Sequence, residues 1–398
     1  MKGSKMYDYL IIGNGIAGLS AAEEIRKNDE KGSILIVSDE KENTYWRTRL
    51  SELIAQDFTD EEILVKKESW YKDKNIEVKL DTHAEKIDKD KKEVTLACGT
   101  VLEYDKLLIA TGAHAFVPPI KNADAEGVFA IRSANDLKEF KNYLADKKKL
   151  IIIGGGILGL EAANSINKLG IEITIVEAFD YLLARQLDKD LSKKLEKSLN
   201  EAGMKTLTGV TSDEILIKDG KVCGLRLSDG TELEADAIMI QAGVRSNLDV
   251  AKDSGLETDR GILVCENLQV ENEDIYVAGD VAQIGNFSIG LWTASMEMGK
   301  IAGANMTGDN KLYEKPKPFS TLILENVKLF SAGQNSGEGI EEVKKENGDK
   351  IYKLFKNGDK FVGGILWNDI SYQTCVKNIV FEGMDPSETK LGKEIFGL

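Results

Sequence analysis

One pattern occurs twice in this chain and limits its fold more than any other feature. A short apolar run leads into Gly-x-Gly-x-x-Gly and then a helical pattern, first at residues 7–18 and again at residues 149–159. The first glycine permits a tight turn, the second lets the backbone approach a pyrophosphate, and the third lets the helix pack close to the strand. The helix N-terminus then presents N–H groups to phosphates. Two copies in the same register predict two dinucleotide sites.

Each copy continues into a second apolar run that ends in acidic residues. Ser38-Asp39-Glu40 follows the run at residues 34–37, and Glu177 follows the run at residues 171–176. A carboxylate at this place can hold ribose hydroxyls. Glu177 would also repel a 2′-phosphate, and the next three residues include no arginine to neutralise one. The second site is therefore predicted to prefer NADH over NADPH.

Length and composition limit the other classes of function. A chain of 398 residues is expected to form two or three domains. Its net charge of −15 argues against nucleic acid or an anionic membrane as partner, because the average field would repel phosphates. No apolar stretch approaches the ~20 residues needed to span a bilayer, and no signal-like segment opens the chain. We therefore expect a cytoplasmic protein.

The cysteines and histidines do not indicate a metal site. Cys98, Cys223, Cys265 and Cys375 form neither C-x-x-C nor C-x4-C, and the chain has two histidines. Zinc sites and iron–sulfur clusters need clustered soft ligands, so neither is expected. We expect four packed free thiols and no disulfide.

Two further strands end in residues suited to a ligand. The run at residues 104–109 ends in Ala110-Thr111-Gly112, and the run at residues 274–278 ends in Gly279-Asp280. Open α/β sheets bind ligands at the carboxyl ends of their strands. Residues 293–306 then read as an amphipathic helix.

The remaining segments indicate strands and a C-terminal domain. Residues 60–105 suggest short strands and turns, and the D-G turns within residues 215–230 predict a β-meander. Lys315-Pro316-Lys317-Pro318 is typical of a linker. Residues 311–398 are therefore predicted to form a small α+β domain.

Together, the two glycine motifs, the Ala-Thr-Gly turn and the Gly-Asp pair resemble the FAD-dependent pyridine-nucleotide–disulfide oxidoreductase superfamily. The resemblance covers the whole chain. It implies an α/β fold with two Rossmann-like domains, the two-dinucleotide-binding flavoprotein fold, plus the small α+β domain. It implies an FAD-binding domain at residues 1–114 and 241–310, an NADH-binding domain at residues 115–240, and a C-terminal domain at residues 311–398.

The same resemblance assigns site residues. FAD would be held by Gly13, Gly15, Gly18, Glu40, Ala84, Thr111, Gly112 and Asp280, with Arg47, Trp292 and Thr293 near the flavin. NADH would be held by Gly154, Gly156, Gly159 and Glu177, with Glu161 beside the nicotinamide as the one catalytic candidate. The cofactors then supply the chemistry and the protein aligns them, so that no protein nucleophile is required.

The branch of the superfamily is indicated by residues 40–56, which contain no cysteine where disulfide reductases and NADH peroxidases place one or two. Glu40, Tyr45, Arg47 and Ser51 match a pattern of the ferredoxin- and rubredoxin-reductase branch. The segment YWRTRLSELI and the short C-terminal domain are most similar to bacterial NADH:rubredoxin reductases. One departure is Glu52, where many relatives carry a lysine that pairs with the glutamate matching Glu161, so that this ion pair cannot form here.

The resemblance implies hydride transfer from NADH to FAD and single-electron transfer to a small iron protein, with rubredoxin as the first candidate. An NADH oxidase that makes peroxide or water is one alternative. Another is the reductase component of a larger oxygenase or nitrite-reducing system. A non-enzymatic alternative is an NADH-sensing flavoprotein. The complete pair Glu161 and Glu177 favours turnover.

Overall fold

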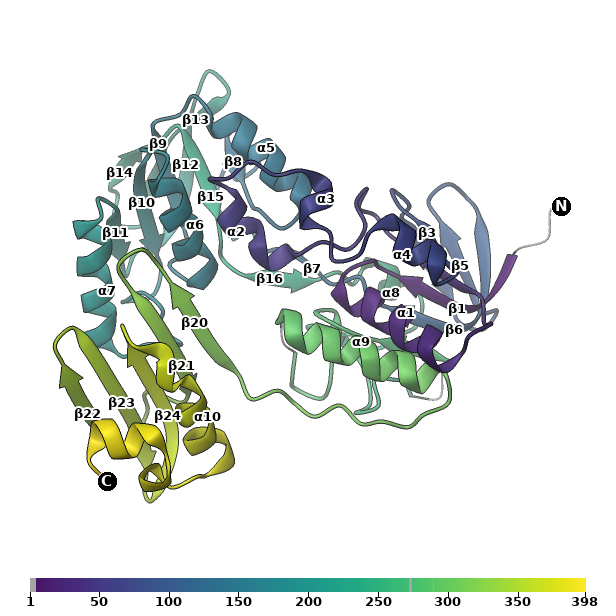
Figure 1. Cartoon of the computed structure of the whole chain (residues 1–398). Coiled ribbons are helices and arrows are strands. Elements are labelled where there is room, and N and C mark those ends of the chain that lie inside the picture. Colours follow the sequence, from purple (N-terminus) through teal and green to yellow (C-terminus); the bar gives the residue numbers. More distant parts are fainter. Residues whose placement is uncertain (1–4, 272–273, 289) are drawn as a thin grey trace. The chain divides into compact units, whose positions relative to one another are not determined.

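The structure is a computed structural model that describes residues 5–271, 274–288 and 290–398. The chain forms two compact units, each assembled from separate segments (Figure 1). Unit 1 combines Met1–Arg49, Asp57–Ala115 and Gly243–Pro316. Unit 2 combines Leu50–Gln56, Phe116–Ala242 and Lys317–Leu398. The predicted boundaries place residues 50–56 with the first domain, whereas here they belong to unit 2.

Unit 1 is built on a sheet with strand order β3-β2-β1-β6-β5-β4, and β18 pairs with β6 on a separate branch. Strands β1, β2, β3, β6 and β18 run parallel, while β5 pairs antiparallel with both β6 and β4. The apolar run of β2 is buried along its whole length, as expected for a parallel strand covered on both faces. The strands are β1 (Lys5–Ile12), β2 (Ile34–Val37), β3 (Ile76–Lys79), β4 (Ala84–Asp88), β5 (Glu93–Leu96), β6 (Val101–Ile109) and β18 (Ile275–Val277).

Helices α1 (Ile16–Asn28) and α9 (Trp292–Met306) lie side by side in unit 1 (Figure 1). They approach closely because α9 carries two glycines on the shared face. A Cβ on Gly299 would lie 2.2 Å from the backbone oxygen of Ala17, and one on Gly303 would lie 2.5 Å from that of Ala21. The helix predicted at residues 293–306 is thus confirmed.

Short elements complete unit 1. They are η1 (Arg47–Arg49), α3 (Asp60–Ile63), α4 (Glu68–Asp73), β7 (Ala113–Ala115), β16 (Val244–Ser246), α8 (Asp249–Lys252), β17 (Ile262–Leu263) and β19 (Ala282–Gln283). The prediction of only strands and turns across residues 60–105 is wrong at α3 and α4. The α3 turn begins with a capping box in which Thr59 and Glu62 bond reciprocally, a signal that the sequence contains.

Unit 2 contains a second parallel sheet of order β11-β10-β9-β15-β8 and an antiparallel sheet of order β12-β13-β14. The second is the predicted β-meander. Together with the sheet of unit 1, the parallel sheet confirms the α/β class. The elements are α2 (Leu50–Leu53), β8 (Val128–Phe129), α5 (Ala134–Leu144), β9 (Lys149–Ile153), α6 (Ile157–Asn167), β10 (Glu172–Glu177), α7 (Lys189–Glu201), β11 (Lys205–Thr208), β12 (Ser212–Lys218), β13 (Lys221–Leu227), β14 (Glu232–Glu234) and β15 (Ala237–Ile240).

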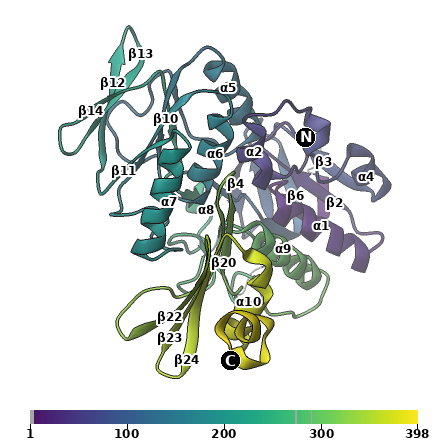
Figure 2. The ribbon, with the colours of Figure 1, turned by 60° about the vertical axis from the view of Figure 1, so that its left-hand side comes forward.

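The C-terminal part of unit 2 is an antiparallel sheet of order β20-β21-β24-β23-β22, against which helix α10 packs through β21 and β24 (Figure 2). The α+β character predicted for residues 311–398 agrees with these elements. They are β20 (Phe319–Ile323), β21 (Lys328–Gly333), β22 (Ile340–Asn347), β23 (Lys350–Asn357), β24 (Lys360–Trp367), η2 (Ile370–Tyr372), α10 (Gln373–Glu382), η3 (Pro386–Glu388) and η4 (Gly392–Phe396).

A buried lysine joins this sheet to the rest of unit 2. The Lys353 side chain is 1% exposed, and its Nζ lies 2.8 Å from Oδ2 of Asp188 and 2.9 Å from Oε2 of Glu342. Asp188 also caps the N-terminus of α7 through its other oxygen. A buried charge is costly without partners. Glu342 pairs with Lys353 within the C-terminal sheet, and Asp188 links the lysine to the N-terminus of α7.

Candidate dinucleotide sites

The first glycine loop connects β1 to α1 and leaves its middle glycine open. Gly13 has a φ of +110°, and a Cβ there would lie 2.1 Å from the backbone oxygen of Ala110. A Cβ on Gly18 would lie 2.0 Å from the oxygen of Gly13. Gly15 is the N-cap of α1, no described side chain caps the helix, and no described atom beyond its chain neighbours lies within 4 Å of its Cβ position. The space and the helix N-terminus suit a phosphate.

The second glycine loop repeats this geometry between β9 and α6. Gly154 has a φ of +116°, and a Cβ there would lie 2.4 Å from the backbone oxygen of Gln241. A Cβ on Gly159 would lie 2.1 Å from the oxygen of Gly154. Gly156 is the N-cap of α6, and no described atom beyond its chain neighbours lies within 4 Å of its Cβ position. The turn at the first glycine, the open middle glycine and the close approach at the third thus agree with the geometry of a pyrophosphate-binding loop, and the assignment of these glycines to the cofactors stays a prediction.

Glu177 lies at the end of β10, directly against the second glycine loop. Its Oε2 accepts a hydrogen bond of 2.7 Å from the N–H of Gly155, and its Oε1 accepts one of 2.8 Å from the N–H of Phe179. The carboxylate is thus oriented by two backbone donors and remains half-buried. This is the arrangement expected of a group that would meet a ribose beside the loop.

Glu40 and Arg47 form an ion pair in unit 1. Arg47 Nη2 lies 2.5 Å from Oε1 of Glu40, and the Tyr45 hydroxyl donates to Oε2 at 2.5 Å. The Arg47 guanidinium also lies 4.9 Å from the centre of the Tyr45 ring. The resemblance assigned Glu40 and Arg47 to different parts of FAD, and the structure brings them together.

Thr111, Gly112 and Asp280 follow neighbouring parallel strands, since β6 and β18 pair in register at Ile109 and Val277. They therefore meet at one edge of the sheet, beside the loop that follows β1. Gly112 has a φ of +67° and open space at its Cβ position among the described atoms.

Residues that the sequence did not indicate hold this edge in place. Asn247 accepts a 2.9 Å bond on its backbone oxygen from Oγ1 of Thr111 and donates from Nδ2 to the oxygen of Thr111. The Ser295 hydroxyl donates to Oδ1 of Asp280 at 2.9 Å. Asn247 lies 136 residues from Thr111, so no local pattern could have linked them.

Trp292, the aromatic residue predicted near the flavin, stacks on Trp46, which the prediction did not include. Trp46 and Trp292 stack with ring centroids 5.5 Å apart and an interplanar angle of 28°. Trp46 is 40% exposed, and Thr293 is exposed on the first turn of α9. Ala84, at the start of β4, is 3% exposed and packs in the core, so its assignment to the adenine stays a prediction.

Glu161 and Glu52 bring two carboxyl groups together in unit 2, where α2 packs against α6. Glu161 is half-buried, and this burial, followed by the charge of Glu52, raises the pKa of Glu161 to about 7. The structure thus places two acidic groups where the resemblance implied a lysine–glutamate ion pair in many relatives. Glu161 can consequently hold a proton near neutral pH.

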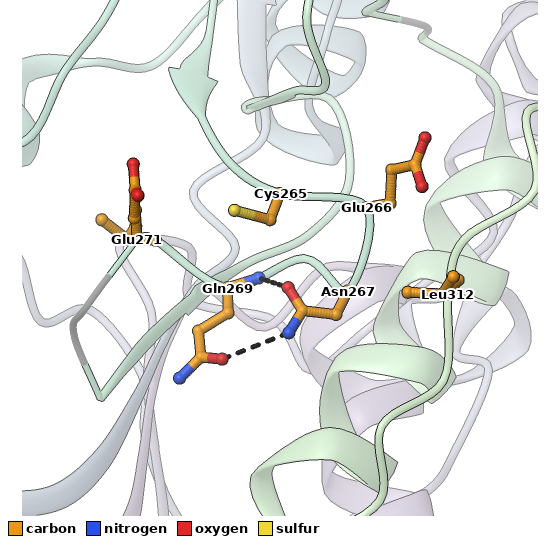
Figure 3. A pocket seen from close by; sticks show the side chains of 7 residues that line it. Cys265, Glu266, Asn267, Gln269, Glu271 and Leu312 are labelled. Atoms are coloured by element: carbon orange, nitrogen blue, oxygen red, sulfur yellow. Dashed lines mark hydrogen bonds between the residues drawn. The ribbon is translucent and has the colours of Figure 1, made fainter.

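The cysteines depart from their prediction. Cys98, Cys223 and Cys265 are exposed and Cys375 is partly buried, so the expectation of four packed thiols is wrong for three of them. Cys265 lines a cavity of about 350 Å³ with Glu266, Asn267, Gln269, Val270, Glu271 and Leu312 (Figure 3). None of these lining residues is a predicted binding residue. In the described part of the chain, no three His, Cys, Asp or Glu side chains gather as metal ligands, and no helix is long and apolar enough to cross a membrane.

Two glycine loops of the same geometry, each at the head of a parallel sheet, define a protein that binds two dinucleotides. Residues 7–299 match the pyridine nucleotide-disulphide oxidoreductase family, and the chain belongs to this family. It is an oxidoreductase that uses FAD and NADH, as the resemblance predicted.

The similar proteins include reductases of several kinds. The chain is 33% identical over 385 residues to the nitrite reductase [NAD(P)H] of Bacillus subtilis, covering 96% of this chain but 48% of that protein. It is 32% identical to the NADH-rubredoxin oxidoreductase of Clostridium acetobutylicum, covering 96% of this chain and 95% of that one. The chain thus spans about half the length of the first relative and nearly all of the second.

Solved structures agree on the fold. The NADH:rubredoxin oxidoreductase of Clostridium acetobutylicum superposes with a TM-score of 0.81 at 30% identity, covering 95% of this chain and 96% of that one. The ferredoxin reductase for the CYP199A2 system of Rhodopseudomonas palustris gives a TM-score of 0.85 at 26% identity, covering 92% and 93% of the two chains.

Proposed function

We propose that this oxidoreductase takes a hydride from NADH and passes electrons one at a time to a small iron electron-transfer protein, with rubredoxin as the acceptor. The observation that carries the proposal is the similarity to NADH-rubredoxin oxidoreductase, which extends over 96% of this chain and 95% of that protein.

The position of the cysteines supports the choice of acceptor. Residues 40–56, where disulfide reductases place a redox cysteine, contain none. A thiol acceptor is thus absent from this segment. Transient complexes between electron-transfer proteins bury little surface and bind weakly, so a small exposed contact area would be enough for the iron protein to dock.

The residues of the chain would bind and orient the cofactors. In this proposal the N–H groups at Gly15 and Gly156 bind the two pyrophosphates, and Glu177 holds the adenosine ribose of NADH. Glu161 lies beside the nicotinamide and keeps a proton on its carboxyl group near neutral pH, which avoids a second negative charge next to Glu52. FAD, when bound, accepts a hydride and releases single electrons.

Stopped-flow absorbance tests the acceptor. The holoenzyme is reduced anaerobically with NADH and then mixed with rubredoxin, with ferredoxin or with air-saturated buffer. Rapid reoxidation by rubredoxin supports the proposal. Rapid reoxidation by air would make the protein an NADH oxidase, and slow reoxidation by all three would favour an NADH sensor or a component of a larger system.

The second candidate is the reductase component of a nitrite-reducing system. The similarity to nitrite reductase favours it, because this chain matches about half of that relative at 33% identity. Such a component would reduce a general one-electron acceptor such as ferricyanide at a high rate but rubredoxin only slowly. The ratio of these two steady-state rates therefore separates the candidates.

A further inference from the structure

A buried group of polar side chains lies beneath the first glycine loop. Oγ1 of Thr44 is 2.9 Å from the backbone oxygen of Asn14, 3.0 Å from its Oδ1 and 3.1 Å from the Tyr71 hydroxyl. Asn14, the residue between the first two glycines of the motif, also donates from Nδ2 to Asn43 at 3.2 Å. Asn14, Thr44 and Tyr71 are 6%, 3% and 2% exposed. Buried polar groups of this kind hold each other in one arrangement.

The bond to the backbone oxygen of Asn14 fixes the peptide that Gly15 shares. A trans peptide is planar, and its C=O and N–H point in opposite directions. Since the Asn14 oxygen accepts from Thr44, the N–H of Gly15 points away from Thr44. Thr44 therefore selects one orientation of the glycine loop.

The segment that carries Thr44 is itself anchored. The N–H of Val65 donates to the oxygen of Thr44 at 2.8 Å, and the N–H of Trp46 donates to the oxygen of Ile63 at 2.9 Å. Tyr71 comes from α4, which follows this anchor in the chain. The glycine loop is thus held by residues 43–46 and by α4, and both lie in unit 1.

We propose that Thr44, through its hydroxyl bonds to Asn14 and Tyr71, is a positioning residue that holds the first glycine loop in the shape that binds the FAD pyrophosphate. The proposal rests on the assignment of FAD to the first loop and is independent of the electron acceptor. A loop that already has its bound conformation loses less conformational entropy when the ligand binds, so the ligand binds more tightly. Loss of the Thr44 hydroxyl therefore weakens FAD binding more than it weakens the fold.

The test measures the dissociation constant of FAD by diluting the holoenzyme and following the fluorescence of released FAD. Thr44→Val keeps the side-chain shape and removes the hydroxyl. It is expected to raise the dissociation constant by about tenfold, the factor that follows from one lost buried hydrogen bond. Thr44→Ser restores the hydroxyl and should bind FAD like the unmodified protein. Tyr71→Phe should give a smaller increase, because the Thr44 hydroxyl can still donate to Asn14.

Tyr9→Phe is the matched control in the same unit. Its hydroxyl donates to Oδ2 of Asp29 at 3.0 Å, beyond the C-terminal end of α1. This variant should lower the melting temperature while leaving FAD affinity unchanged. Unchanged FAD affinity in Thr44→Val would overturn the proposal. So would a loss of FAD affinity in both Thr44→Val and Tyr9→Phe that is proportional to the drop in melting temperature of each variant. If Thr44→Val does not fold, FAD affinity and melting temperature are compared between Tyr71→Phe and Tyr9→Phe instead, and an unchanged FAD affinity in Tyr71→Phe would overturn the proposal.

Discussion

At the residue scale, Glu177 is held against the second glycine loop and is proposed to bind the cofactor there as well. Two backbone N–H groups, from Gly155 and Phe179, orient it. A ribose hydroxyl can still donate to a carboxylate oxygen, whereas a 2′-phosphate would place like charges in contact. We therefore predict that the preference for NADH over NADPH depends on the charge of this side chain.

Glu177→Arg should narrow the preference for NADH over NADPH, measured as the ratio of kcat/KM values, by at least about tenfold, since removal of a like-charge contact is worth a few kcal/mol. Glu177→Gln serves as the control, because its amide oxygen can still accept a backbone bond without carrying charge. We expect the glutamine variant to keep an intermediate ratio. Equal use of both nucleotides by the unmodified protein would contradict the assignment.

Glu161 should make stability depend on pH. Its pKa of about 7 in the folded protein exceeds the ordinary value of 4.5, so between these values the folded state binds the proton more strongly than the unfolded chain. Stability should accordingly fall as pH rises from 4.5 to about 7, and this contribution should level off above that range.

Glu161→Gln should flatten this dependence, as measured by urea unfolding at a series of pH values. Glu172→Gln, at an exposed position of β10, is the matched control and should keep the slope of the unmodified protein. Equal slopes for the unmodified protein and Glu161→Gln would show that Glu161 does not carry the proton.

At the scale of elements, the sequence predicted those features that short-range chemistry determines. The glycine loops, the meander and the C-terminal strands were recoverable because turns, spacing and alternation lie within a few residues of one another. Helices α3 and α4 were missed because such short helices show little periodicity. The contacts of Asn247 and Thr44 join distant segments, and nothing in the local sequence of either partner encodes them.

The contact between α1 and α9 gives a further prediction. Gly299→Ala should lower stability by about 1–3 kcal/mol, because a methyl 2.2 Å from the Ala17 oxygen must displace a helix. The better helix propensity of alanine offsets only about 1 kcal/mol. Urea unfolding measures the difference, and Lys300→Ala, exposed on the same helix, should have little effect. Unchanged stability of Gly299→Ala would mean that the helices can separate at no cost.

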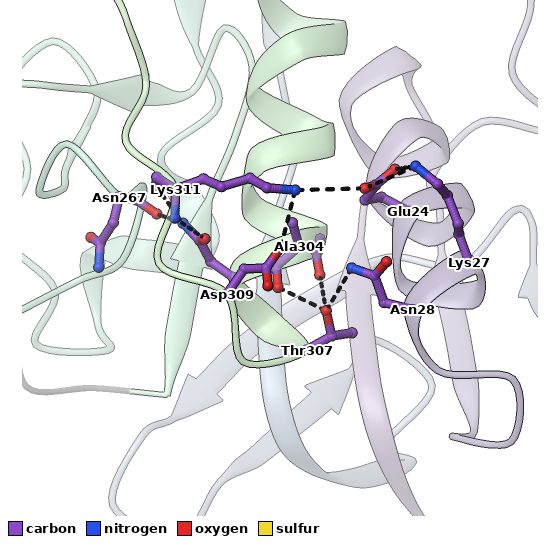
Figure 4. A network of polar contacts seen from close by, with 10 residues as sticks. Glu24, Lys27, Asn28, Asn267, Ala304, Thr307, Asp309 and Lys311 are labelled. Atoms are coloured by element: carbon purple, nitrogen blue, oxygen red, sulfur yellow. Dashed lines mark hydrogen bonds and ion pairs between the residues drawn. The ribbon is translucent and has the colours of Figure 1, made fainter.

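Polar contacts secure the far end of the same helix pair (Figure 4). Between the two helices, Asn28 Nδ2 donates to Oγ1 of Thr307 at 3.1 Å. In the segment that follows α9, Lys311 Nζ lies 3.0 Å from Oδ2 of Asp309. Buried Asn305 donates to the backbone oxygens of Asn267 and Lys311 at 2.8 and 2.9 Å. The exposed pairs contribute little individually, whereas the Asn305 bonds fix the chain that leaves α9.

For the whole molecule, the four cysteines lie outside residues 40–56, so we predict that no thiol takes part in electron transfer from NADH to the acceptor. Replacing all four cysteines with serine should leave steady-state electron transfer from NADH to the acceptor intact. The cost in stability should be small, because three of the four side chains are exposed. FAD content of the variant is the control. Loss of activity with FAD fully bound would show that a thiol carries the electrons, and would return the protein to the disulfide-reductase branch.

The interleaved segments of the two units have a consequence for synthesis on the ribosome. Strand β18 and helix α9 belong to unit 1, yet they are translated after Phe116–Ala242, which contains the parallel sheet of unit 2. Translation proceeds at ~5–20 residues per second, so the first segments of unit 1 precede β18 and α9 by on the order of ten seconds. During this time β6 lacks its partner β18, and the surface of α1 at Ala17 and Ala21 is not yet covered by α9. The inserted sheet can close first, so the segments of unit 1 that precede it would need chaperone protection more than the inserted sheet itself.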